Sequence, residues 1–353
     1  MEGKEERASN IELLRIVAVM GVIIQHYSGD LRDKLDFILP GSTSKYALEI
    51  LISMFICAVN VFILISGYFM SISGERKVWK PFRMLAQVIL FSISAYLISC
   101  FMGHQHFVLE NLVKRLIPTD YFVNLYITLY LISPYINVVL NTLSEKKLRQ
   151  MLAIFLFMFS IWPTGADILE YATGHSWIGL STIGAYGSQR GFTIVNFSLL
   201  YMLGAYIRIR EKAEGQKKSI AGLAGIYGIC VAVMSVWAHA DWSPGWEYCN
   251  PVVILEAICV FLIFMRLNIG QKKGVNVVAK GVFGVYLFHT NFFGYIPMSS
   301  VIVRNPLILV IYIFLISMGI YGVCWCVDRV YRLIMNRIYA ALLKYICFPV
   351  IKV

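Results

Sequence analysis

Two ionisable residues stand at the ends of an apolar run near the N-terminus, in the stretch RIVAVMGVIIQHY from Arg15 to Tyr27. Ionisable side chains are costly inside a bilayer, so Arg15 and His26 each require a partner or a function. An imidazole in this place is suited to take up a proton as a general base. On an α-helix eleven positions return to within roughly 20° of the same direction and span roughly 16 Å along the axis. The two residues therefore share one helix face at two depths.

Carboxylates on the same helix offer partners for both residues. Glu12 lies three positions before Arg15, which is the spacing of an ion pair. That pair would hold the arginine near the cytoplasmic boundary, and the alternative is a purely structural arginine that snorkels to the interface. Asp30 lies one turn beyond His26 if the helix continues past Gly29. Its carboxylate would then fix the imidazole tautomer, although a lone interfacial histidine is more often structural.

Two more ionisable residues are expected in the same outer half of the membrane. His289, in GVFGVYLFHTNFF, falls well along the ninth predicted helix. Glu256, in NPVVILEAICVF, lies about two turns into the eighth. If the first, eighth and ninth helices meet, the two histidines and this carboxylate form one polar cluster.

The histidines and cysteines do not follow the spacing of a zinc site, and no metal is expected. HExxH, GxSxG, a Walker loop and GxGxxG are all absent from the sequence, so a serine hydrolase or a nucleotide-binding fold has no support. The eight cysteines are scattered, mostly inside apolar segments, and are interpreted as small core residues.

The elements that must position these residues are membrane helices. Of the 353 residues 59% are apolar and 14% are charged, and the mean hydropathy is +0.70, far above that of an ordinary globular domain. We predict an all-α polytopic membrane protein, with one integral-membrane domain over residues 1–353 and about ten transmembrane helices. The fifth helix is the weakest prediction, because Trp162 and Pro163 cut it short. The predicted helices lie near residues 11–28, 46–71, 82–103, 119–142, 149–165, 193–209, 218–238, 249–268, 275–298 and 304–327.

The positive charges predict the orientation of these helices. Of the 31 Lys and Arg residues, 23 fall in loops on the N-terminal side, seven fall on the opposite side, and Arg15 lies within the first helix. Both termini are therefore expected in the cytoplasm. The net charge of +11 follows from the same asymmetry, so membrane lipid headgroups or a phosphorylated cytosolic ligand are expected as partners, and nucleic acid is not. The first helix has no small-x-small cleavage site, so we expect it to be retained.

The first helix and several later stretches resemble the membrane acyltransferase-3 family. The signature of this family is a basic residue, ten intervening residues and a histidine, and Arg15 and His26 stand at that spacing. The similar stretches follow the family's order over most of the chain. They are VFILISGYFM at 61–70, YFVNLYITLYLISPYIN at 121–137, YMLGAYIRIR at 201–210 and YLFHTNFF at 286–293.

The resemblance implies an O-acyltransferase of the cell membrane. Such enzymes move an acyl group, commonly acetyl from acetyl-CoA, to a hydroxyl of an extracytoplasmic carbohydrate, a lipid-linked sugar or a similar acceptor. In this chain that activity would be a polysaccharide modification of the cell envelope. Acyl-CoA would be a co-substrate, and no tightly bound cofactor is implied.

The resemblance also assigns roles to particular residues. His26 would be the catalytic base, and Arg15 would bind the acyl-CoA or stabilise charge as the donor reaches into the membrane. Ser66, Gly67 and Tyr68 would line the donor path. The outer reaction centre would be supported by His289, with Glu12, Asp30 and Glu256 as further supporting groups.

Two other interpretations stay open. A transporter or flippase for a glycan or lipid-linked precursor would use the same buried charges, although no inverted repeat is apparent and a transporter forms no covalent product. A purely structural membrane protein would not explain why Arg15 and His26 share a face. The segment 164–192 is rich in Gly, Ser, Thr and aromatic residues, which suits a lid or a carbohydrate contact as well as a plain connecting loop.

Overall fold

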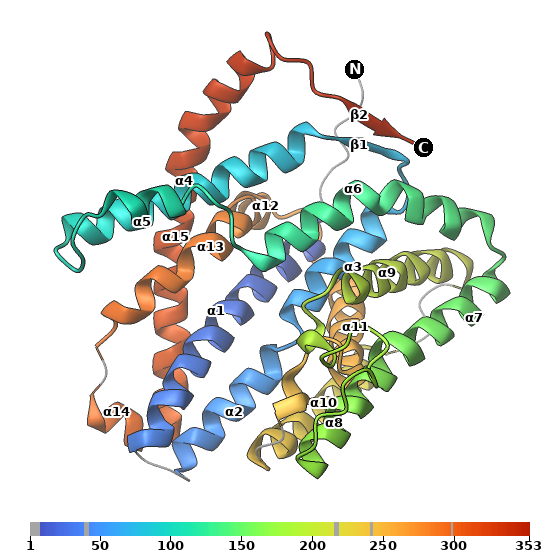
Figure 1. The fold of residues 1–353 in the computed structure, drawn as a ribbon, viewed down its shortest axis with the longest axis horizontal. Coiled ribbons are helices and arrows are strands. Elements are labelled where there is room, and N and C mark those ends of the chain that lie inside the picture. Colours follow the sequence, from blue (N-terminus) through green and yellow to red (C-terminus); the bar gives the residue numbers. More distant parts are fainter. Residues whose placement is uncertain (1–7, 39–41, 215–218, 241–242, 298) are drawn as a thin grey trace.

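A computed structural model describes residues 8–38, 42–214, 219–240, 243–297 and 299–353 of the chain (Figure 1). Helices make up most of it, and the only strands in the described part are two short ones. The first half holds α1 (Ser9–Ile38), α2 (Thr43–Phe55), α3 (Ala58–Met70), β1 (Glu75–Lys77), α4 (Trp79–Phe101), α5 (Leu109–Lys114), α6 (Tyr121–Thr142), α7 (Glu145–Leu156), the π-helical η1 (Phe157–Ile161) and α8 (Trp162–Thr173). The second half holds the 3-10 turn η2 (Gln189–Gly191), α9 (Ile194–Glu214), α10 (Ile220–His239), η3 (Ser243–Trp246), α11 (Pro251–Arg266), α12 (Lys273–Ala279), α13 (Val282–Phe288), the 3-10 helix η4 (His289–Tyr295), α14 (Ser300–Arg304), α15 (Pro306–Leu342) and β2 (Val350–Lys352).

Seven helical segments in the described part of the chain are long and apolar enough to cross a membrane. They coincide with the first five predicted helices, the seventh and the tenth, which confirms a polytopic all-α architecture. The sixth prediction corresponds to α9, and the eighth corresponds to α11, which has only 16 residues. The exact count of ten remains a prediction.

Two predicted helices differ from the structure in extent or continuity. The fifth helix is not cut short, because α7 continues through the π-helical turn into α8, which ends at Thr173. Pro163 directly follows the π-helical turn, whose altered hydrogen bonding accommodates the missing N–H. Residues 164–173 are therefore helical, and the outer connecting segment begins only after them.

The ninth predicted helix, residues 275–298, consists instead of α12, α13 and η4. The chain breaks between α12 and α13 where it packs tightly on α15. A side chain at Gly281 would collide with Trp325, and one at Gly284 would collide with Asp328. His289 is consequently the first residue of η4 rather than a residue within a long helix.

The centre of the bundle is formed by α1 and α3, and both contribute buried residues to a shared apolar core. Helices α3 and α9 approach closely because small residues line their contact. A Cβ at Gly67 would collide with the backbone carbonyl of Tyr201, and one at Gly204 would collide with that of Leu64. Gly67 is thus a packing residue between two helices.

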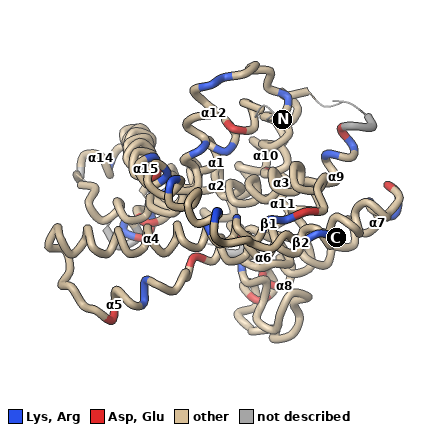
Figure 2. Tube along the Cα trace, turned by 90° about the horizontal axis from the view of Figure 1, so that it is seen from above, with Lys and Arg blue, Asp and Glu red and all other residues tan. Residues whose placement is uncertain are grey.

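The end of the bundle where α1 begins is here called the inner end, and the opposite end is called the outer end. Helices α2 and α3 return to the inner end, where β1 pairs antiparallel with β2 (Figure 1). Figure 2 shows Lys and Arg on the segment that leads into α12, on α9 and beside the two strands. Four of the basic residues used to predict the orientation, Lys4, Arg7, Lys217 and Lys218, lie outside the described residues, and a cytoplasmic inner end remains a prediction.

Candidate active site

A pair of histidines joins α1 to η4. Nδ1 of His26 lies 2.9 Å from Nε2 of His289, and the two ring planes are only 16° apart. The ring centroids are 5.1 Å apart, which matches the nitrogen–nitrogen distance plus the radius of each ring. The imidazoles therefore meet edge to edge in a hydrogen bond, and the sequence-based expectation that the two histidines lie at one depth is confirmed.

The hydrogen-bond network fixes the tautomers of both rings. Nδ1 of His289 lies 2.6 Å from the carbonyl oxygen of Tyr286, and a carbonyl can only accept. In a neutral His289, Nδ1 therefore carries the proton and Nε2 accepts. His26 must then donate from its Nδ1, which leaves the lone pair of its Nε2 available. A general base requires an unprotonated nitrogen, and Nε2 of His26 meets this requirement.

Asp30 does not hold His26, which corrects the prediction made from the helix spacing. Helix α1 does continue past Gly29, but Asp30 accepts a hydrogen bond from Lys34 Nζ at 2.7 Å. The partner that orients His26 is His289, contributed by a segment 263 positions away.

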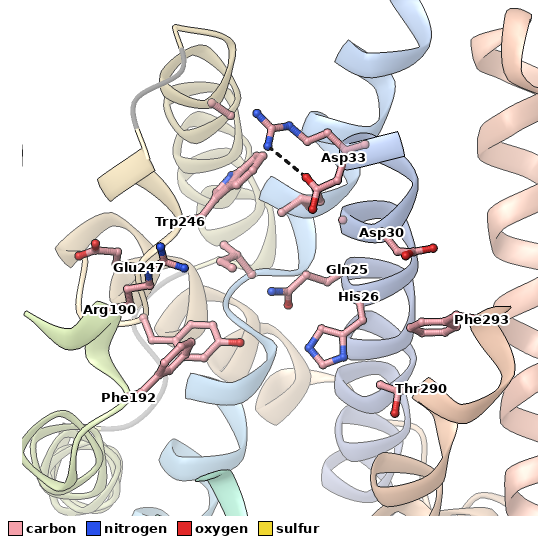
Figure 3. Close-up of a pocket in the computed structure, with 16 residues that line it drawn as sticks. Gln25, His26, Asp30, Asp33, Arg190, Phe192, Trp246, Glu247, Thr290 and Phe293 are labelled. Atoms are coloured by element: carbon pink, nitrogen blue, oxygen red, sulfur yellow. Dashed lines mark ion pairs between the residues drawn. The ribbon is translucent and has the colours of Figure 1, made fainter. Parts of the chain in front are cut away.

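An outer cavity of about 610 Å³ opens beside His26 (Figure 3). Its walls come from α1, from the turn between α2 and α3, from the segments around η2 and η3, and from η4. The side chains that shape it are Gln25, His26, Asp30, Trp246, Tyr248 and Phe293. In Figure 3 the side chains of Gln25 and His26 lie next to each other on the cavity wall. A cavity of this size falls within the roughly 300–1,000 Å³ of small-molecule sites.

An inner cavity of about 310 Å³ lies on the other side of the histidine pair. Arg15, Ser66, Lys80, Tyr126 and Tyr286 contribute to its lining. The predicted ion pair on α1 is present, because the guanidinium of Arg15 lies 3.1 Å from a carboxylate oxygen of Glu12.

Of the three residues that the resemblance placed on the donor path, only the first lies at the inner cavity. The hydroxyl of Ser66 donates to the Phe62 carbonyl at 2.9 Å and lies at the cavity wall. Gly67 packs against α9 instead, and the ring of Tyr68 lies under the guanidinium of Arg208 at 5.0 Å.

The two cavities lie end to end along the same pair of segments. On α1, Arg15 and Val22 face the inner cavity, and Gln25 and His26 face the outer one. On α13 and η4, Tyr286 lines the inner cavity and Thr290 lines the outer one. His289 lies between these last two positions, so the histidine pair stands where the cavities approach each other.

Glu256 is not part of this arrangement. It is fully buried on α11, near Cys57, Cys230 and Tyr227, and it lines neither cavity. Neither of its carboxylate oxygens has a hydrogen-bond partner among the described residues.

Sequence reasoning did not single out Gln25, Lys80 or Tyr126 as site residues, although Gln25 precedes His26 and Tyr126 lies in the family-like stretch 121–137. Only the packing of α1, α4 and α6 brings the last two to the inner cavity.

Glu247, between η3 and α11, accepts a hydrogen bond from Ser188 at 2.7 Å, and burial raises the pKa of its carboxyl to about 8. From about pH 4.5 to 8 the folded chain retains a proton that the unfolded chain has released, so the stability contributed by Glu247 falls as pH rises through this window.

We expect the melting temperature of the wild type to fall, between pH 5 and pH 9, by at least about 3 °C more than that of Glu247→Gln. Glu170→Gln, at the neighbouring surface, is the control and should behave as the wild type. Equal pH profiles for the wild type and Glu247→Gln would contradict the assignment.

No group of three or more His, Cys, Asp or Glu side chains in the described residues is arranged to hold a metal ion. A family model described as an acyltransferase domain matches residues 9–329 of the chain. No curated protein and no solved structure matches it significantly.

Proposed function

The chain belongs to the membrane acyltransferase-3 family, and from this premise we propose that it transfers an acyl group from acyl-CoA to a hydroxyl on the far side of the membrane. The observation that carries the proposal is the free Nε2 of His26 at the outer cavity, on the same face of the helix that presents Arg15 to the inner cavity. One helix thus contributes a basic nitrogen to one cavity and a cation to the other.

The chemistry follows from the tautomer of His26. Its Nε2 removes the proton of an acceptor hydroxyl in the outer cavity as the oxygen attacks the thioester carbonyl. The tetrahedral intermediate collapses, the bond from carbon to sulfur breaks, and the leaving thiolate takes the proton back from the imidazolium. The products are an acyl ester of the acceptor and free CoA thiol. Throughout these steps His289 holds the imidazole of His26 in place.

The donor is proposed to enter from the cytoplasm through the inner end. The inner cavity lies at the small end of the usual range for ligand sites, so it would take the thioester arm and leave the nucleotide outside. Arg15 and Lys80 supply positive charge there, and a guanidinium suits thioester or phosphate oxygens. We propose acetyl as the group transferred, and a carbohydrate or lipid-linked sugar of the cell envelope as the acceptor.

Mass spectrometry of surface glycans and lipid-linked sugars tests the function. A strain without the protein should lose one acyl mass from one class of molecule, and the wild-type gene should restore it. If instead a glycan precursor fails to cross the membrane and no acyl mass changes, the protein is a transporter and the proposal is wrong.

The donor role of Arg15 is tested with the same product. In membranes supplied with radiolabelled acetyl-CoA, Arg15→Ala should raise the KM for the donor by roughly 10- to 100-fold, because a hydrogen bond to a charged group is lost. Arg15→Lys should retain part of the affinity, since charge remains without the planar fork. Arg337→Ala removes a basic residue of α15 that does not line the cavity and is the control. An unchanged KM in Arg15→Ala would exclude Arg15 from donor binding.

A further inference from the structure

The segment from Gly187 to Gly191 presents Arg190 to the outer cavity through a strained backbone. Gln189 and Arg190 have φ angles of 52° and 55°, in the left-handed region that residues other than glycine rarely adopt. Two such residues in succession are uncommon, and strain of this kind tends to occur at functional sites.

The surrounding structure holds this conformation from several sides. The carbonyl of Arg190 accepts from the backbone N–H of Tyr248 at 2.9 Å, and its own N–H donates to the Ser188 hydroxyl at 3.1 Å. The Ser188 N–H donates to the carboxylate of Asp167 on α8 at 3.2 Å. A side chain at Gly191 would collide with the backbone of Cys249. The backbone conformation at Arg190 is therefore fixed by contacts with other segments of the fold.

The guanidinium of Arg190 is exposed and has no ion-pair partner among the described residues. The carboxyl of Glu247 lies on the same wall and accepts a hydrogen bond from Ser188 at 2.7 Å, and burial raises its pKa to about 8, so it is a weaker countercharge than an ordinary carboxylate. Elsewhere on the cavity wall Asp30 pairs with Lys34, and the guanidinium of Arg32 lies 3.4 Å from Glu49 and 3.9 Å from Asp33. Arg190 is thus an available cation at the rim of the cavity (Figure 3).

Aromatic rings stand beside this cation. Phe192, Trp246 and Tyr248 all contribute to the cavity wall, and the indole N–H of Trp246 is fixed by a 3.0 Å hydrogen bond to Ser53. The guanidinium of Arg32 lies over the Trp246 ring at 5.1 Å and Tyr248 is buried, so Phe192 is the most exposed of the three rings. Flat apolar faces with a few fixed polar groups suit the binding of a sugar ring.

We propose that the acceptor is an acidic sugar, whose carboxylate or phosphate binds to Arg190 while one of its hydroxyls reaches Nε2 of His26. A guanidinium binds either oxyanion through two parallel hydrogen bonds, which also orients the ring. This inference rests on the proposed function, because it names the chemical class of the acceptor for the same site.

The test compares three glycosides that differ only at C6: methyl glucoside, methyl glucuronide and methyl glucoside 6-phosphate. Their affinities for the full chain in lipid nanodiscs are measured by saturation-transfer NMR. At pH 7 the wild type should bind at least one acid roughly tenfold more tightly than the neutral glucoside. The two acids show whether a carboxylate or a phosphate is preferred. Arg190→Gln should reduce this difference to less than about twofold, and Arg190→Lys should keep part of it. Arg304→Gln, on α14 and away from the cavity, is the control and should keep the full difference.

Four outcomes are distinct. A preference for an acid that disappears in Arg190→Gln supports the inference. Equal affinities in the wild type, no detectable binding of any of the three, or a preference that persists in Arg190→Gln overturn it. The same samples are then given radiolabelled acetyl-CoA. If the acids bind through Arg190 but no acyl ester forms, the binding site stands and the proposed transferase activity fails.

Discussion

Replacing His26 with alanine is expected to reduce acyl transfer by about a thousandfold. General-base catalysis contributes roughly 10²–10⁴ to a rate, and Nε2 of His26, which the histidine pair leaves unprotonated, is the proposed base. The measurement is the rate at which radiolabel passes from acetyl-CoA to the acceptor in membranes that contain equal amounts of protein. His175→Ala removes an exposed histidine after α8 and should leave the rate unchanged.

The loss in His26→Ala must be separated from misfolding. The side chain is only half-buried on α1, so the variant should reach the membrane and retain its melting temperature within about 3 °C. Near-wild-type transfer by a folded His26→Ala protein would remove His26 from the mechanism.

Replacing His289 with phenylalanine is expected to lower kcat by about a hundredfold. Phenylalanine fills similar space but cannot accept a hydrogen bond from His26 Nδ1. The imidazole of His26 is then no longer held in the tautomer that carries its proton on Nδ1 and leaves Nε2 unprotonated. Glutamine can accept from His26 and donate to the Tyr286 carbonyl, so His289→Gln should stay within about tenfold of the wild type. The KM for acyl-CoA should be the same in all three proteins, because His289 does not line the inner cavity.

A merely structural role for His289 predicts a different pattern. In that case Phe and Gln would lower kcat equally, or both would change the melting temperature. The dependence of kcat on pH adds a second readout, since a base that has lost its partner should titrate at a different pH from the wild type.

The sequence predicts the parts of this site that depend on one helix. The spacing of Arg15 and His26, and the ion pair of Glu12 with Arg15, follow from helix geometry, and the structure shows both. The same local reasoning chose Asp30 as the partner of His26, because Asp30 is one turn away. The real partner, His289, is distant in sequence and becomes adjacent only when η4 packs against α1.

Packing also explains the differences in the fold. The apolar pattern of residues 275–298 predicts one helix, and the pattern itself contains no sign that Gly281 and Gly284 must lie against α15. The position of Arg190 depends on hydrogen bonds from three separate segments, so no local motif could have indicated it.

The separation of the two cavities has a consequence for the membrane itself. No described residue lines both of them, and the histidine pair stands between them. In the proposed reaction an acyl group of a few atoms passes this point, whereas the CoA and the acceptor remain on their own sides. Such a reaction would export an acyl unit while the bilayer keeps its barrier to ions, and it would need neither a pump cycle nor an open channel.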